Sequence, residues 1–181
     1  IIGIFVYIAW AFRKMPHFFR YSAAAILALA HDVLIVLGLF SIMGKAFGME
    51  MNTMVITAIL AVIGYSINNT IVVFDRVREN MLNRTPGNFG EVVNNSLLET
   101  IGRSLNTSLT TSFTLLALLL FGGGTLQAFI LVLLTGVIAG TYSSMLIGPQ
   151  LLVIWENGEF RDIVRRIQSK VSGTKRKPSS T

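Results

Sequence analysis

Cysteine is absent from this 181-residue chain, and histidine occurs only at positions 17 and 31. Without cysteine there is no disulfide framework, no thiolate metal site and no cysteine nucleophile. Two histidines this far apart exclude a His-x-x-x-His metal pair. His31 and Asp32 are adjacent, so on a helix they point about 100° apart and are not expected to form a dyad. We therefore expect no enzymatic activity, no metal and no cofactor.

Charge is also scarce, at 13% of residues, whereas 52% are hydrophobic and the mean hydropathy is +0.65. This balance is typical of a polytopic membrane protein. A net charge of +6 can indicate nucleic acid, but the basic residues lie between and after the apolar runs, without an aromatic-interleaved patch. The fold is predicted to be all-α, a transmembrane helix bundle over residues 1–155 in a lipid bilayer, with no nucleic-acid partner.

Four apolar runs reach the roughly 20 residues that a membrane span needs. The predicted spans are 21–43, 51–74, 102–121 and 125–155. The shorter run 1–12 is interpreted as the end of a helix whose beginning, with the true N-terminus, precedes Ile1.

Polar and basic segments separate and follow these runs. Residues 89–101 carry apolar side chains at helical spacing, which favours an amphipathic helix on the membrane surface, within a cytoplasmic segment near 76–101. Residues 156–181 read as a basic, partly disordered tail. Of the 15 basic residues, only Lys45 lies outside the turn at 13–20, the segment 76–103 and the tail. The positive-inside rule therefore predicts a cytoplasmic C-terminus.

Polar side chains within the spans are the candidate functional groups, because hydrocarbon offers them no hydrogen-bond partners. Asn68 and Asn69 lie in the second predicted span, either at a wet cavity or as links between helices. Asp32 lies near the centre of the first, where insertion costs roughly 2.5–3.5 kcal/mol. It is either a protonatable or pairing group, or a structural hydrogen-bond acceptor for a neighbouring helix.

Two further patterns concern the last two spans. A polar row, called here the hydroxyl stripe, follows one face of a helix and suits a hydrated path or a partner helix, although Thr can also bond its own backbone. It comprises Arg103, Asn106, Thr107, Thr110, Thr111 and Thr114. A row of small residues recurs every fourth position, is interpreted as a helix-packing seam, and is expected to end or kink at Pro149. This packing seam comprises Gly136, Gly140, Ser144 and Gly148.

Several strings, in order and spanning about 1–155, resemble the SecF subunits of bacterial SecD–SecF protein-export complexes. They are AHDV at 30–33, AVIGYSIN at 61–68, VFDRVREN at 73–80, NSL at 95–97, TIGRS at 100–104 and FGG at 121–123. The resemblance implies helices two to six of a six-helix half of a resistance-nodulation-division transporter. It also implies the bacterial inner membrane, a SecD-like partner, the SecYEG channel, exported polypeptide, and use of a proton or sodium gradient.

One position departs from the family pattern. An Asp usually follows the residue matching Asn68, and the resemblance assigns it to an ion relay with an Arg at position 103. This chain has Asn69 there, and an amide cannot gain or lose a proton. Either the chain is an engineered or trapped variant, or proton handling is left to the SecD-like partner. We expect Arg103 to bond Asn69 or a partner carboxylate, or to snorkel to the interface.

Three functional hypotheses follow. The first is an ion-gradient-driven translocation subunit with Asn69 and Arg103 at the relay position. Its pathway would also include Asp32, Asn68, Asn106, Thr107 and Thr110. The second is a non-conducting scaffold that holds the partner subunit and the channel. The third is an exporter of other substrates on the same fold.

Overall fold

The computed structural model describes residues 3, 6, 10, 18–83 and 88–156. In this part of the chain all regular elements are helices. Four helical stretches are long and apolar enough to cross a membrane, namely Phe19–Phe47, Thr53–Leu82, Phe89–Phe121 and Gly124–Glu156. The predicted all-α transmembrane bundle is therefore confirmed. The expectations for residues 1–12 and for the basic tail fall almost wholly outside the described residues.

Helices α2 (Phe18–Phe47) and α3 (Thr53–Leu82) are joined by a short connection. The side chain of Asn52 caps α3 by accepting a hydrogen bond from the Val55 amide, which satisfies one of the free N–H groups of the first turn. The helix also runs beyond its predicted end at Phe74. Its charged continuation is favoured by pairs of side chains three residues apart, in which Arg76 contacts Glu79 at 2.6 Å.

Helix α4 (Phe89–Phe121) is one continuous helix, where the sequence suggested a surface helix followed by a span. Asn88 and Glu91 form a capping box at its start. Val93 is buried in a cluster with Phe74 and Leu152, so the apolar face of residues 89–101 packs on α3 and on the last helix. The expectation of a separate helix lying on the membrane surface is wrong. An apolar face at helical spacing suits a protein neighbour as well as a lipid surface.

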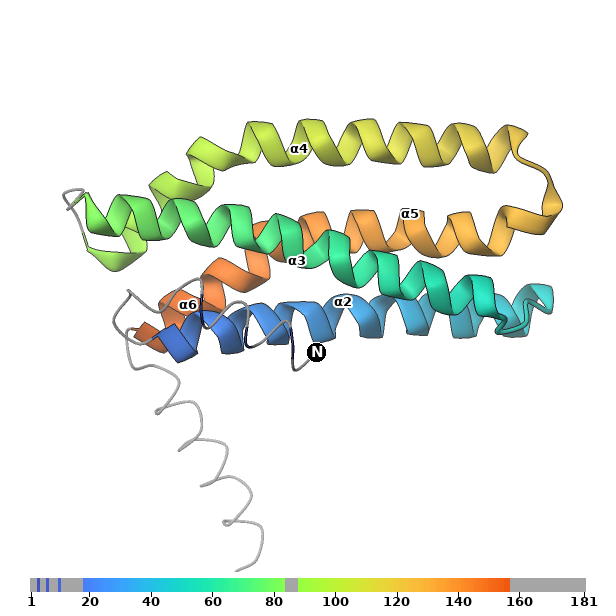
Figure 1. Ribbon diagram of the computed structural model, residues 1–181, viewed down its shortest axis with the longest axis horizontal. Helices are drawn as coiled ribbons and strands as arrows, with labels where there is room; N and C mark the ends of the chain where they lie inside the picture. Colours follow the sequence, from blue (N-terminus) through green and yellow to red (C-terminus); the bar gives the residue numbers. More distant parts are fainter. Residues whose placement is uncertain (1–2, 4–5, 7–9, 11–17, 84–87, 157–181) are drawn as a thin grey trace, which may run out of the picture.

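The last predicted span is divided into two helices. After the short 3-10 turn η1 (Gly124–Leu126) come α5 (Gln127–Tyr142), the π-helical turn η2 (Ser143–Ile147) and α6 (Gly148–Glu156). Pro149 lacks an N–H, and its ring clashes with the carbonyl four residues earlier in a regular helix. A wider π-turn just before Pro149 relieves this conflict. Figure 1 shows the chain changing direction between α5 and α6.

Helix α3 contacts α2, α4, α5 and α6, and it is the element around which the others gather (Figure 1). One apolar cluster surrounds Phe74 at the end of the bundle where α6 lies. A second surrounds Val62 between α2, α3 and α5, and a third joins α4 to α5 around Ile130. Because α3 passes through the bundle, its polar residues are brought against neighbours on several sides.

Candidate functional site

Asp32, in the middle of α2, has a fully buried side chain. Its Oδ2 atom accepts hydrogen bonds from two hydroxyl groups: Ser66 Oγ on α3, and Ser143 Oγ on η2 at 2.7 Å. Its Oδ1 atom lies 3.1 Å from His31 Nδ1. We call these four residues the carboxyl site. One carboxyl group thus joins three elements that are far apart in the sequence.

The prediction that His31 and Asp32 cannot form a pair is wrong. Their Cβ atoms do point in different directions, but consecutive Cα atoms are only about 3.8 Å apart, so side-chain rotation brings the imidazole to the carboxyl. The His31 side chain remains 35% exposed, and its ring lies against that of Tyr142, with centroids 6.4 Å apart. His31 therefore connects the buried carboxyl with the outer surface of this chain.

Small residues of the packing seam set the distance between α5 and α3. A Cβ atom on Gly136 would lie 2.1 Å from Val62 Cγ2, and one on Gly140 would lie 3.1 Å from Ser66 Cβ. The absence of these side chains allows the close approach that small-residue seams provide. It also carries the end of α5 towards α2, so that Ser143 reaches Asp32.

The other two seam residues lie beyond Gly140. Ser144 is fully buried, and its hydroxyl donates to the Thr141 carbonyl oxygen at 3.0 Å. Gly148, at the start of α6, faces Phe74, because a Cβ atom there would lie 3.5 Å from the ring. All four seam residues are therefore buried or packed against α3, or both.

Asn69 is buried on α3, one turn beyond Ser66, and only 4% of it is exposed. Its Nδ2 atom finds no hydrogen-bond partner in the described part of the chain. The neighbouring Asn68 is exposed. An amide donor left unpaired away from water costs free energy, and the described residues leave Asn69 Nδ2 in that state.

Arg103 does not bond Asn69 as one of the three sequence expectations proposed. It is exposed on α4, and its guanidinium makes no hydrogen bond or ion pair with any described residue. It lines a pocket of about 290 Å³ between α3 and α4. The other lining residues are Val72, Asp75, Arg76, Glu79, Glu99 and Thr100. Contact with a partner carboxylate and snorkelling remain as expectations for its side chain.

Charged side chains gather at the end of the bundle where α3 ends and α4 begins. Arg76 bonds both Glu79 and Glu99. Asn80 adds hydrogen bonds to Ser96 Oγ at 2.9 Å and to Glu99 Oε2 at 3.0 Å. Exposed ion pairs of this kind contribute little to stability. This is the end that the count of basic residues assigns to the cytoplasm.

The hydroxyl stripe of α4 points away from the interior of this chain. Thr107 and Thr110 are exposed, and each donates its hydroxyl to the backbone carbonyl four residues earlier, at 3.0 Å and 2.8 Å. Thr111 and Thr114 make the same local bond. Asn106 is exposed too. The stripe therefore lines no path inside the described bundle and is available to a neighbour.

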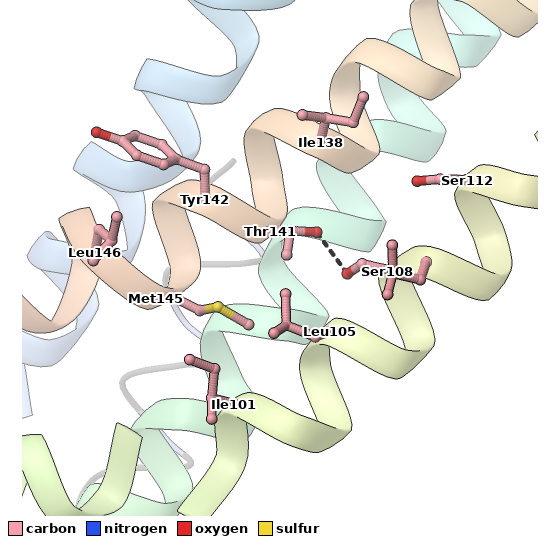
Figure 2. A pocket seen from close by; sticks show the side chains of 10 residues that line it. Ile101, Leu105, Ser108, Ser112, Ile138, Thr141, Tyr142, Met145 and Leu146 are labelled. Carbon is pink, nitrogen blue, oxygen red and sulfur yellow. Dashed lines mark hydrogen bonds between the residues drawn. The ribbon is translucent and has the colours of Figure 1, made fainter. Parts of the chain in front are cut away.

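A second polar row on α4 was missed by the sequence reasoning. This inner row faces α3 and α5 and repeats every four residues; it comprises Ser96, Thr100, Ser104, Ser108 and Ser112. Thr141 Oγ1 donates to Ser108 Oγ at 2.6 Å (Figure 2). Ser108 Oγ also lies 2.9 Å from Tyr65 OH. Ser108, Ser112 and Thr141 are among the residues that line a pocket of about 390 Å³, whose surface is almost wholly apolar. The four-residue spacing is the signal that would have revealed the row.

Comparison with known proteins gives a consistent family. Residues 1–158 match the model of the family described as protein export membrane protein SecD/SecF, C-terminal. Proteins named protein translocase subunit SecF are 53% identical in Thermobaculum terrenum and 46% identical in Anaerolinea thermophila, over 96% and 91% of this chain. The chain covers 55% and 54% of their lengths, so it spans about half of the curated relatives it matches.

Solved structures agree with this match. A crystal structure of SecDF in its super-membrane-facing form aligns with a TM-score of 0.73 and 40% identity, over 90% of this chain and 21% of that one. A crystal structure of Thermus thermophilus SecDF, described as a translocon-associated membrane protein, gives a TM-score of 0.76 and 41% identity over 84% and 20%. The helix arrangement of Figure 1 is therefore similar to part of a SecDF protein.

Proposed function

Because this chain belongs to the SecD/SecF family of protein-export membrane proteins, we propose that it is the SecF-like membrane subunit of a protein translocase. In this proposal an ion gradient across the bacterial inner membrane assists polypeptide export through the SecYEG channel. The observation that carries it is the 53% identity, over 96% of the chain, to a protein named protein translocase subunit SecF. No catalytic step is part of the proposal.

A SecD-like partner is supported by the outer face of α4. Arg103 and Asn106 expose polar side chains there, and such groups are costly against hydrocarbon unless another protein segment or water receives them. A relative from Thermus thermophilus is named protein translocase subunit SecDF and is 42% identical over 156 residues, which make up 20% of its length. We infer that the hydroxyl stripe faces a helix of the partner subunit.

Single introduced cysteines test this contact, because the chain has none of its own. In the full-length protein, Thr110→Cys should crosslink to cysteines placed on membrane helices of the SecD-like subunit. Leu34→Cys is the matched control, since Leu34 is exposed on α2, away from the stripe. Crosslinking that is equal at both positions, or stronger from α2, would reject the stripe as the contact face.

Ion coupling is tested at the position where the family pattern has a carboxyl. Asn69 is buried, and a carboxyl introduced there can be protonated and deprotonated, whereas the amide cannot. Asn69→Asp in the complete complex is expected to increase the dependence of export on an imposed gradient. Asn68→Asp, exposed one residue away, is the control. Unchanged export of a reporter polypeptide with Asn69→Asp would contradict the proposal.

A scaffold that holds the SecD-like subunit and the channel is the second candidate, and the amide at Asn69 is the observation that favours it. A scaffold predicts that deleting the subunit reduces export equally with and without a gradient. A coupled subunit predicts that an ionophore abolishes the difference between the deletion strain and the complemented strain. Measuring the efflux of small molecules or lipids in the same strains tests the third hypothesis, export of other substrates.

A further inference from the structure

We propose that Asp32 is a proton-binding group of this chain, and that Ser66 and Ser143 are the hydroxyls that respond when it takes up a proton. The inference rests on the proposed ion-coupled function, but it assigns proton binding to α2 rather than to the Asn69 and Arg103 positions. The carboxyl site would let a chain with an amide at position 69 bind a proton within the membrane.

The first argument is the environment of the carboxyl. Asp32 is the buried acidic side chain of the described residues, whereas the other described Asp and Glu side chains are exposed. A buried carboxylate kept only for structure is normally paired with a permanent cation. Among described residues, no Lys or Arg contacts Asp32, and its partners are two hydroxyls and one imidazole. Its charge is therefore not fixed by a neighbour that is always ionised.

The second argument is a route for the proton. His31 contacts Asp32 Oδ1 and is partly exposed, and histidine exchanges protons near neutral pH. Tyr142 at the end of α5 packs on the His31 ring. From α3 and η2 the groups that reach the carboxyl are hydroxyls, so His31 is the titratable group in contact with Asp32 in the part of the chain that the structure describes.

The third argument is that a serine hydroxyl at the carboxyl site has an alternative hydrogen-bond acceptor. An ionised Asp32 accepts hydrogen bonds from both serines. Uptake transfers the proton of His31 Nδ1–H to Asp32 Oδ1, and the imidazole takes up a proton from bulk water, so the N–H bond that breaks is replaced. Oδ2 then belongs to a neutral carboxyl and is a weaker acceptor than a carboxylate oxygen, so one serine hydroxyl can turn to another acceptor. Ser143 Oγ has the Gly140 carbonyl oxygen at 3.5 Å for this purpose. Protonation would therefore move one bond from the α2–η2 contact into the helix turn containing η2.

Infrared titration of the full-length protein with its partner in lipid nanodiscs tests this directly. The carbonyl band of a protonated carboxyl should grow as the pH is lowered from about 9 to about 4, and Asp32→Asn should remove one component. Asp75→Asn, at the exposed charged end, is the matched control and should leave that component in place. The absence of any Asp32-dependent component over this range would overturn the proposal.

A second variant keeps the test decisive if Asp32→Asn fails to assemble. Ser143→Ala removes one of the two hydroxyl donors to Oδ2, so the midpoint of the Asp32 band should move. Ser144→Ala, whose hydroxyl bonds the Thr141 carbonyl instead, should leave the midpoint unchanged. An unmoved midpoint in Ser143→Ala overturns the site even where gradient-dependent export persists. Loss of gradient dependence with an intact Asp32 titration would instead contradict the proposed function.

Discussion

Asp32 and Asn69 are both buried polar residues at membrane depth, and they differ in their hydrogen-bond partners within this chain. The Asp32 carboxyl has partners from α2, α3 and η2, whereas Asn69 Nδ2 has none among the described residues. Arg103, the residue expected beside Asn69, is exposed on α4. The comparison separates a polar site that the described residues complete from one where they leave a buried donor unpaired.

The largest effect is expected from Asp32→Ala. The substitution leaves two buried hydroxyls without their acceptor and opens a cavity, so the free energy of unfolding should fall by about 2–4 kcal/mol. Thermal unfolding of the purified full-length protein in detergent measures the change. Asn69→Ala is the paired control: it opens a cavity of similar size, but Nδ2 has no hydrogen bond to lose among the described residues, so it should cost less than Asp32→Ala. Equal losses of unfolding free energy in Asp32→Ala and Asn69→Ala would contradict the difference between the two sites.

A smaller loss in the free energy of unfolding is expected when a side chain is added to a glycine of the packing seam. Gly136→Ala places a methyl group against Val62, whose β-branched side chain is stiff, and should cost about 1–3 kcal/mol. Gly64→Ala on α3 is the matched control, because a Cβ atom there meets nothing within 4 Å. The control should be neutral or stabilising, since Ala favours helix over Gly. Similar melting temperatures for the two variants would contradict the close approach of α5 to α3.

Replacement of the unpaired amide should have little effect on folding. Asn69→Leu exchanges a buried donor without a partner for an apolar group of similar size, so the free energy of unfolding is expected to change by less than about 1 kcal/mol. If a partner subunit supplies the missing acceptor, the same variant should weaken assembly with that subunit. Co-purification at matched expression levels distinguishes the two effects. A strongly unfolded Asn69→Leu would show that this chain alone depends on the amide.

The smallest effect is expected at the charged end. Arg76 bonds Glu79 and Glu99 at an exposed position, where water and salt screen the interaction. Arg76→Gln should lower the melting temperature slightly at low salt, and the difference from the unmodified protein should vanish as the salt concentration rises. Repeating the melts at several ionic strengths measures this. A difference that persists in high salt would indicate a structural role beyond ion pairing.

Much of the fold could be predicted because a helical membrane span can be recognised from its length and hydropathy. The polar residues at depth could be identified for the same reason. Their partners could not, because Ser66 and Ser143 are separated from Asp32 by 34 and 111 positions and serine alone carries no distinctive signal. The His31 contact depends on side-chain rotation, which residue spacing does not describe.

Residues 89–101 illustrate a different limit of prediction from sequence, because a separate surface helix was expected there and the structure instead makes them part of α4. Val93 belongs to an apolar face that the sequence displays clearly, but the pattern does not say what covers that face. Here Leu152 of α6, almost sixty positions later, covers it together with residues of α3. To predict which residues pack on this face, one must know where α6 lies, and the π-helical turn before Pro149 sets that position.

That turn also decides how the seam stays aligned over its length. A regular α-helix advances about 100° per residue, so positions four apart drift by about 40°, and three such steps would rotate Gly148 by about 120° away from Gly136. The π-helical residues 143–147 wind more slowly and take back part of this rotation. The register correction keeps Gly136 on Val62 and Gly148 on Phe74 at once, so both ends of the last span pack against α3.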